Sequence, residues 1–271
     1  MTGNQESVTL SVGGRQVAEY VFAPKLEPTL VPRPYLHPVR TLAGTVVTDL
    51  LPADHAWHLG VSLAMPDVAG ANLWGGRSYV HERGYVWLDD HGEIEHVRWL
   101  QSASGELQEE LRWRGPDGAA LLTEQRTVRV EDCGDGRGWV LTFSFELTNA
   151  GAEAVELRSP AVNGRGEGAG YGGFFWRLPA ISEGRVVAGA LRDEDAINGS
   201  AEPSVTMSGL VDGAPVSLTF GGLAESDRWF VRLAEYPGIG AALAFERPLT
   251  IAPGASVRRR YQVLVSDGAQ A

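Results

Sequence analysis

Short segments in which apolar and polar residues alternate recur along the whole chain, with turn residues between them. The clearest pair is residues 7–12 and 15–22, because both segments alternate and only Gly13 and Gly14 separate them. Two glycines between alternating segments are typical of a β-hairpin with a two-residue turn. The sequence therefore predicts an N-terminal β-ribbon within residues 1–30.

The alternation becomes regular after Gly84, where Gly, Pro, Asn or Asp separates the segments. This regular series comprises residues 85–88, 93–102, 106–113 and 120–130, and separate strands are expected at residues 45–50, 139–148 and 256–265. A turn roughly every ten residues predicts an antiparallel meander, and further hairpins are expected at Asp212-Gly213 and Pro237-Gly238. No linker or change of composition divides the chain. We therefore expect an all-β fold, a large antiparallel β-sandwich with little helix, as one domain over residues 1–271.

Composition and charge exclude several classes of function. The 271-residue chain has a formal net charge of −11, which repels a phosphate backbone, so nucleic acid is not an expected partner. Cys133 is the only cysteine, which excludes an internal disulfide and a thiolate metal cluster. Neither a secretory signal nor a run of about 18 apolar residues occurs. We expect a cytoplasmic protein without membrane association. The sequence does not decide whether it forms a homodimer.

The densest group of side chains that exchange protons near neutral pH lies in residues 51–60. Two of the six histidines, His55 and His58, stand there beside Asp54 and Trp57. Histidine suits general acid–base chemistry near pH 7, and a carboxylate can orient it. We expect His55 and His58 as acid and base, with Asp54 as the orienting group. The alternative is a structural turn in which Asp54 caps backbone amides and one histidine packs under Trp57.

A second stretch, residues 163–177, is rich in glycine and ends in aromatic residues. Its aromatic and charged members are Arg165, Glu167, Tyr171, Phe174, Phe175, Trp176 and Arg177. Aromatic rings can stack on the C–H face of a sugar while charged groups bind its hydroxyls, which predicts the opposite wall of a pocket. So many glycines favour tight geometry or close approach of a ligand. The alternative is that these aromatic residues belong to the core.

Other residues are weaker candidates for the same pocket. We expect Trp74 as a second stacking platform beside Trp176, and His81 as a further substrate contact. Glu124 would be a second acid or base if its side chain pointed inward, and an exposed ion pair with Arg126 is the alternative. The list of candidates also includes His37.

Our main expectation is a site without any cofactor. A site that holds a divalent metal is the alternative. His55 and His58 could bind a metal together with His81 or Glu82 as the third ligand. Strand positions three apart point to opposite faces, so both histidines could reach one metal only if their segment is a turn or a bulge.

Five short sequence motifs lie between about residue 30 and the C-terminus. They are Arg33-Pro34-Tyr35, Asp54-His55-x-x-His58-x-Gly60, Asn72-Leu73-Trp74, Tyr171-Gly172-Gly173-Phe174-Phe175-Trp176-Arg177, and Trp229-Phe230-Val231-Arg232 followed by Ala244-Phe245-Glu246. In them the chain resembles a bacterial family of unknown function labelled "methane oxygenase PmoA-like". That family usually has another histidine and an arginine where this chain has Trp57 and Leu59, which argues against a three-histidine metal site.

The resemblance implies a large sandwich similar to the galactose mutarotase superfamily, and sugar chemistry as the function. A membrane methane oxygenase would need several apolar spans, and this chain has none. We expect a sugar-active protein that binds a monosaccharide or keto-sugar and catalyses proton transfer, either anomer interconversion or elimination and hydration. In this hypothesis Arg165 and Arg177 bind hydroxyls. The rival hypotheses are a non-catalytic carbohydrate-binding module and a metal-dependent oxidase or hydrolase.

Overall fold

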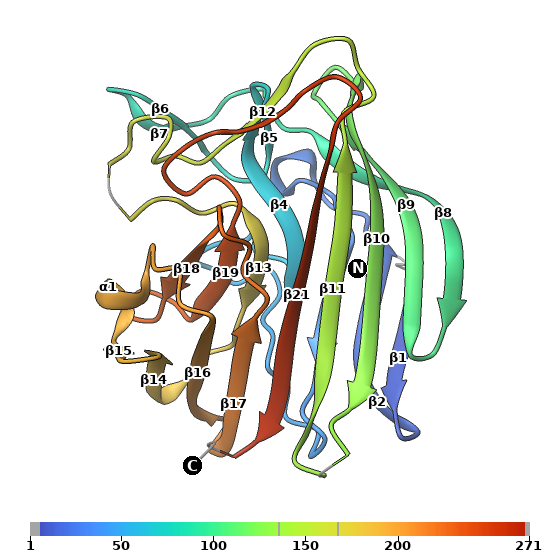
Figure 1. The fold of residues 1–271 in the computed structure, drawn as a ribbon, viewed down its shortest axis with the longest axis vertical. Coiled ribbons are helices and arrows are strands. Elements are labelled where there is room, and N and C mark those ends of the chain that lie inside the picture. The colour runs from blue at the N-terminus through green and yellow to red at the C-terminus, as the bar shows by residue number, and fades with distance from the viewer. Residues whose placement is uncertain (1–5, 135, 167, 269–271) are drawn as a thin grey trace.

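Two large antiparallel β-sheets lie face to face and form most of the molecule (Figure 1). The structure is a computed structural model, and it describes residues 6–134, 136–166 and 168–268. The chain crosses between the sheets repeatedly, so each sheet contains strands from both halves of the sequence. Side chains that lie far apart in the sequence are therefore brought close together at the sheet edges and in the connecting loops.

The first sheet has ten strands, and its main path follows the order β1-β2-β3-β4-β13-β19-β18. Its strands are β1 (Glu6–Val12), β2 (Arg15–Ala23), β3 (Tyr35–Val39), β4 (Val61–Val68), β5 (Ala71–Leu73), β12 (Val155–Arg158), β13 (Gly173–Arg177), β18 (Arg228–Arg232), β19 (Gly238–Ala242) and β20 (Leu249–Ile251). The short strand β13 lies between β4 and β19. This pairing joins the second half of the chain to the first.

The second sheet has nine strands in the order β15-β14-β16-β17-β21-β11-β10-β9-β8. Its strands are β8 (Glu93–Ala103), β9 (Glu106–Arg114), β10 (Ala120–Asp132), β11 (Gly138–Thr148), β14 (Ser182–Ala188), β15 (Leu191–Arg192), β16 (Ser204–Val211), β17 (Ala214–Gly221) and β21 (Ser256–Asp267). The C-terminal strand β21, dark red in Figure 1, lies between β17 and β11. The expected meander is confirmed over β8, β9 and β10, whereas its first expected segment, residues 85–88, does not join this sheet.

The remaining regular elements are small. Strands β6 (Ser78–Val80) and β7 (Gly84–Val86) form a separate two-stranded sheet. The helical elements of the described residues are a 3₁₀ turn, η1 (Pro28–Leu30), and a four-residue helix, α1 (Glu194–Ile197). No helix within the described ranges has the length and apolar character needed to cross a bilayer. The predicted large antiparallel β-sandwich with little helix is confirmed.

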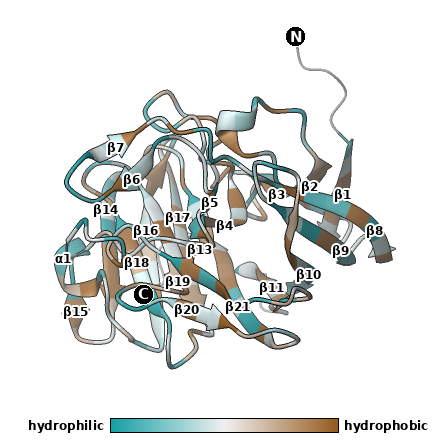
Figure 2. Ribbon diagram, turned by 90° about the horizontal axis from the view of Figure 1, so that it is seen from above, coloured by the Kyte–Doolittle hydropathy of each residue, from teal (hydrophilic) through white to brown (hydrophobic). Residues whose placement is uncertain are grey.

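The main hydrophobic core fills the space between the two sheets. Along β9 every second residue is buried, and Figure 2 shows hydrophobic and hydrophilic bands on the strands of the sheets. This period of two is what a sheet with one covered face requires. The two sheets meet through aromatic pairs: Phe174 of β13 lies 5.2 Å from Phe143 of β11, and Trp176 lies 5.7 Å from Phe220 of β17, between ring centroids.

The other local expectations were mostly met, with one further correction. The first hairpin turns at Gly13 and Gly14, whose φ angles of 56° and 80° are readily adopted by glycine. Residues 45–50, however, form no regular strand. Their backbone groups bond singly to different neighbours: the amide of Val47 donates to the carbonyl of Val39, and the amide of Asp49 to the carbonyl of Arg177. A segment shared between two partners cannot form a continuous ladder with either.

Candidate functional site

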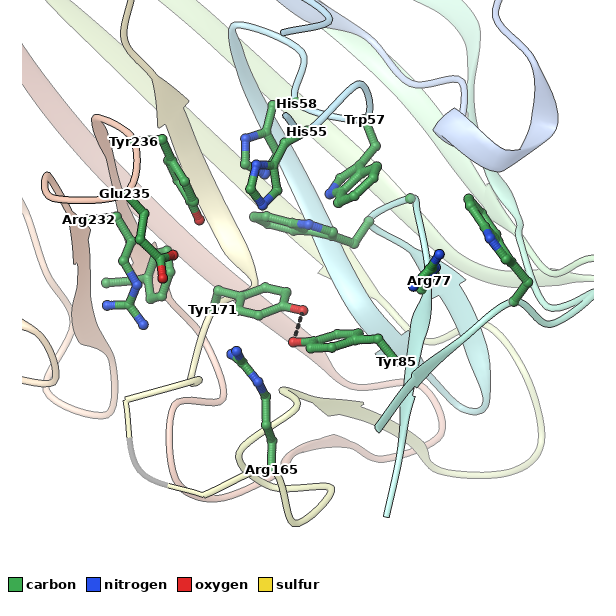
Figure 3. Close-up of a pocket in the computed structure, with 14 residues that line it drawn as sticks. His55, Trp57, His58, Arg77, Tyr85, Arg165, Tyr171, Arg232, Glu235 and Tyr236 are labelled. Carbon is green, nitrogen blue, oxygen red and sulfur yellow. Dashed lines mark hydrogen bonds between the residues drawn. The ribbon is translucent and has the colours of Figure 1, made fainter. Parts of the chain in front are cut away.

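A cavity of about 430 Å³ opens among loops that join strands of the first sheet and the small β6–β7 sheet (Figure 3). From the first ninety residues its lining includes His55, Trp57, His58, Trp74, Arg77 and Tyr85. From the rest of the chain come Arg165, Tyr171, Phe230, Arg232, Glu235 and Tyr236. This volume and this mixture of rings with a few charged groups are typical of a small-molecule site.

The loop at residues 51–60 brings two imidazoles together. An isolated bridge between Leu50 and Leu59 closes its base, and the amide of Leu51 donates to the carbonyl of His58 at 3.0 Å. The amide of His58 in turn donates to the carbonyl of His55 at 2.9 Å, which makes the segment a turn. The two rings therefore lie on the same side and stack, with centroids 4.7 Å apart and planes 16° apart.

Asp54 connects one of these imidazoles to a buried arginine. His55 donates its Nδ1 proton to Oδ2 of Asp54 at 2.8 Å, and Nη2 of Arg177 donates to both oxygens of the same carboxylate at 3.1 and 3.0 Å. Burial acts to raise the pKa of Asp54, but the hydrogen bond from His55 and the charge of Arg177 outweigh it and lower the pKa. A charged Asp54 keeps the proton of neutral His55 on Nδ1, so Nε2 of that ring can accept a proton.

His58 is in a different environment, although its ring stacks on that of His55. Its side chain is 1% exposed, and its Nδ1 atom has no hydrogen-bond partner within the described part of the chain. Rings of Phe175, Trp74 and Tyr236 surround it at centroid distances of 4.9, 5.8 and 5.3 Å. Burial, together with the positive charges nearby, lowers the pKa of His58 well below its ordinary value. The imidazole is therefore neutral at pH 7.

Buried polar side chains hold the aromatic wall of the cavity. Arg33, which is fully buried, donates from Nη2 to the carbonyl of Trp57 at 2.8 Å. Asn72 accepts hydrogen bonds through Oδ1 from the amides of Trp74 and Gly75 at 2.9 and 2.8 Å. At Gly75, whose φ is +106°, a Cβ atom would lie 2.6 Å from Cβ of Trp57. Only glycine allows this close approach of the two loops.

Two tyrosines meet on the other side of the cavity. The hydroxyls of Tyr85 and Tyr171 lie 2.9 Å apart, the hydrogen bond drawn in Figure 3. The ring of Tyr171 packs on Trp74 at 4.9 Å. Burial raises the pKa of both hydroxyls, and it raises the pKa of Tyr236 to about 12. These phenols therefore keep their protons at neutral pH and can donate hydrogen bonds to a ligand.

The structure brings most of the expected site residues together. His55, His58, Trp74, Arg165 and Tyr171 all line the cavity. Asp54 and Arg177 adjoin it through His55 and through Tyr236, over whose ring the guanidinium of Arg177 lies at 4.4 Å. Asp54 and Arg177 contact lining residues but do not line the cavity themselves. Arg177 is therefore not in the hydroxyl-binding position that we expected. Glu167 lies outside the described residues.

Three expected site residues are placed elsewhere, and one of them is His81, which is exposed outside the cavity lining instead of being a substrate contact. Trp176 is fully buried between the sheets, and its Nε1 donates to the carbonyl of Val47 at 2.8 Å, so it does not face the cavity. Glu124 is also fully buried and lies outside the cavity lining. It accepts hydrogen bonds from Arg126 at 2.7 and 2.9 Å and from Trp113 at 2.7 Å. The ion pair with Arg126 that we weighed as exposed is thus a buried one.

The expected third metal ligand does not lie near the two stacked histidines. His81 is exposed and packs against Gly164, and it is not part of the cavity lining with His55 and His58. Among the described residues, no three His, Cys, Asp or Glu side chains are arranged to hold a metal ion. His37 also lies outside the lining, and its Nδ1 is 2.9 Å from Oγ1 of Thr48. The structure therefore gives the metal alternative no support.

Several lining residues were missed from the sequence. These are Arg77, Tyr85, Trp87, Phe230, Arg232, Glu235 and Tyr236. For β18 the alternation of side chains along a strand could have indicated this role. Trp229 and Val231 belong to the main core, so Phe230 and Arg232 must share the opposite face. The loop that carries Glu235 and Tyr236 gave no comparable signal.

The fold and this cavity define an all-β sandwich protein with an aromatic, histidine-containing pocket. The model of a family described as "Family of unknown function (DUF6807)" matches residues 7–271, and the chain belongs to this family. Its name differs from that of the PmoA-like family that the motifs resemble, so membership of the latter stays a prediction. No curated protein matches the sequence.

Solved structures with a related fold include two that are covered over their full length. A galactose mutarotase related enzyme from Lactobacillus acidophilus has a TM-score of 0.49 and 8% identity, over 98% of this chain and 100% of that one. A proposed aldose 1-epimerase from Escherichia coli K12 has a TM-score of 0.48 and 12% identity, over 97% and 100%. At such identities the likeness concerns the fold alone.

Proposed function

We propose that this protein binds a monosaccharide or a keto-sugar in the cavity and catalyses proton transfer on it. The observation that carries the proposal is the stacked pair His55 and His58 on the wall of an aromatic cavity. One imidazole is anchored to the carboxylate of Asp54, and the other is buried and neutral. Two imidazoles in unlike environments are suited to opposite roles, one giving a proton and one taking it.

Anomer interconversion would use the pair as follows. Neutral His58 accepts the proton of the anomeric hydroxyl, and His55 in its protonated form, oriented by Asp54, donates a proton from Nε2 to the ring oxygen. The bond between the anomeric carbon and the ring oxygen breaks, and a carbonyl forms at that carbon. Closure on the other face of the carbonyl reverses both transfers. The same pair could remove a proton beside the carbonyl of a keto-sugar, which begins elimination.

The aromatic lining supports the sugar as the substrate class. Trp57, Trp74, Tyr171 and Tyr236 present ring surfaces and phenol hydroxyls to the cavity. Rings pack against the C–H groups of a sugar, while hydroxyl and guanidinium groups bond its oxygens. A non-catalytic carbohydrate-binding module would use the same lining, and the observation that favours this second candidate is that His58 is almost fully buried.

Exchange NMR on a panel of sugars and 3-keto-sugars tests the proposal. We expect the wild-type protein to accelerate interconversion or elimination of at least one member. His58→Gln and His55→Gln should each lower that rate by about 10²–10⁴-fold while the sugar still binds. His81→Gln is the matched control, because this histidine is exposed and outside the cavity.

Two results would contradict the catalytic assignment. An unchanged rate in His58→Gln at saturating sugar would show that this imidazole accepts no proton in the reaction. Saturable binding with no acceleration of any sugar would instead establish the binding module.

A further inference from the structure

The cavity is locally basic in a chain that is acidic overall. Arg77, Arg165 and Arg232 line it, and Glu235 is the one acidic residue in the described lining. The whole chain has a net charge of −11. Figure 3 shows the three arginines on three sides of the cavity. A concentration of positive charge that runs against the overall balance attracts anions to this place.

Each of these guanidinium groups lies over an aromatic ring of the same cavity. The carbon at the centre of the guanidinium is 5.8 Å from the ring of Trp87 for Arg77, and 5.0 Å from that of Tyr85 for Arg165. For Arg232 the corresponding ring, that of Phe230, is 4.6 Å away. Stacking holds a guanidinium by its flat face and leaves the N–H groups at its edge directed sideways. These edges are what a carboxylate or a phosphate binds.

Arg77 and Arg165 form no ion pair within the described ranges, in contrast to arginines that are paired on the surface of the second sheet. Arg98 and Arg114 each form an ion pair with a glutamate on the surface of the second sheet, with contacts of 2.8 and 2.9 Å. Neither Arg77 nor Arg165 has a hydrogen bond or an ion pair with another described residue. Their five N–H donors are therefore available to a ligand.

Arg232 is held more firmly. It donates from Nη2 to the carbonyl of Gly168 at 2.7 Å, and its Nη1 lies 3.6 Å from Glu194. This arginine adds a fixed positive charge to the cavity, whereas Arg77 and Arg165 supply the free donors.

We infer that the sugar bound in this cavity carries an anionic group, a carboxylate or a phosphate, which binds the free guanidinium edge of Arg165 or that of Arg77. The inference rests on the proposed sugar site and narrows its substrate class. A planar guanidinium binds either group through two parallel hydrogen bonds. A neutral sugar would leave these donors without an anionic partner, so it should bind more weakly than its charged counterpart.

Titration calorimetry with three probes tests the inference. The probes are D-glucuronate, D-glucose 6-phosphate and D-glucose, each titrated in low salt and in 0.5 M NaCl. We expect at least one anionic probe to bind about tenfold or more tightly than glucose, and salt to weaken that advantage. At least one of Arg165→Gln and Arg77→Gln should weaken the anionic probe by about tenfold more than it weakens glucose. Arg98→Gln, outside the cavity, is the control.

The outcomes separate this inference from the proposed catalysis. Preference for glucuronate or for glucose 6-phosphate identifies the anionic group, and either result supports the inference. Glucose binding as tightly as both anionic probes overturns it, and so does an unchanged affinity in both cavity variants, whose folding a urea titration confirms. Tight binding of an anionic probe without any proton exchange would refute the catalysis alone, while binding of none of the three refutes the inference.

Discussion

The Glu124–Arg126 pair provides a test of whether Glu124 stabilises the fold or belongs to the site. Both side chains are fully buried, and three donors converge on the two carboxylate oxygens: Nε and Nη2 of Arg126 and Nε1 of Trp113. Burial acts to lower the pKa of Arg126, but the charge of Glu124 outweighs it and raises the pKa. Glu124→Gln keeps the size of the side chain and removes its charge.

The expected loss of stability follows from these contacts. The amide of glutamine has one acceptor oxygen where the carboxylate had two, so at least one of the three donors loses its acceptor. Arg126 keeps a bond to the hydroxyl of Tyr20 at 3.0 Å, but it loses its nearest counter-charge. Removing one partner from a buried ion pair costs about 3–5 kcal/mol. With an m-value of about 3 kcal/mol/M, the urea midpoint should fall by roughly 1–1.7 M.

Urea unfolding and the exchange assay together decide the question. Glu110→Gln on the adjacent strand β9 is the control, because its partner Arg98 is largely exposed and such pairs contribute about 0–1 kcal/mol. A shift in Glu124→Gln no larger than in Glu110→Gln would refute the reasoning. Loss of sugar conversion in a fully folded Glu124→Gln protein would return this residue to the list of catalytic candidates.

Three further predictions follow from the site and the core. Burial lowers the pKa of His58, so the unfolded state binds more protons, and in urea titrations the stability that this residue contributes should fall by up to about 1.4 kcal/mol per pH unit below about pH 6.5. Burial also lowers the pKa of His37, so His58→Gln should reduce the pH dependence without abolishing it. Gly75→Ala should displace Trp57 and weaken sugar binding in titrations, whereas Gly44→Ala, with a similar φ of +100° and open surroundings, should not. Trp176→Phe should destabilise the fold by roughly 1–3 kcal/mol in urea and leave sugar affinity unchanged, because it loses only the bond to a buried carbonyl and part of the core.

Alternation and turn residues were sufficient to predict most of the fold. In the hairpin at Asp212-Gly213, for example, Val211 pairs with Ala214, and glycine at φ +79° completes the turn. These signals are local, because both the strand and its turn lie within about twenty residues. Residues 45–50 show the limit of predicting strands from local sequence. They have strand-like composition, but whether a segment forms a ladder depends on a partner that its own sequence does not specify.

The candidate site was predicted where its residues are close in sequence. Asp54, His55 and His58 lie within five positions, so any compact turn brings them together. Tyr236 contacts both histidines, with ring centroids 4.7 and 5.3 Å away, although it lies about 180 positions later. Its approach depends on the pairing of β18 with β19, which positions the connecting loop at the cavity. No local pattern encodes such a contact.

Strand β13 explains why Trp176 was assigned to the wrong place. All five of its residues are buried, so both faces are covered and the usual contrast between polar and apolar positions is absent. Phe174 and Trp176 point into the core between the sheets, whereas Phe175 packs with Trp74 beside the cavity, and Arg177 on the same face reaches Asp54. Because successive side chains alternate, one glycine-rich motif supplies both the core and the support of the two histidines. A substitution at Phe175 should therefore disturb the site first, and one at Phe174 the fold.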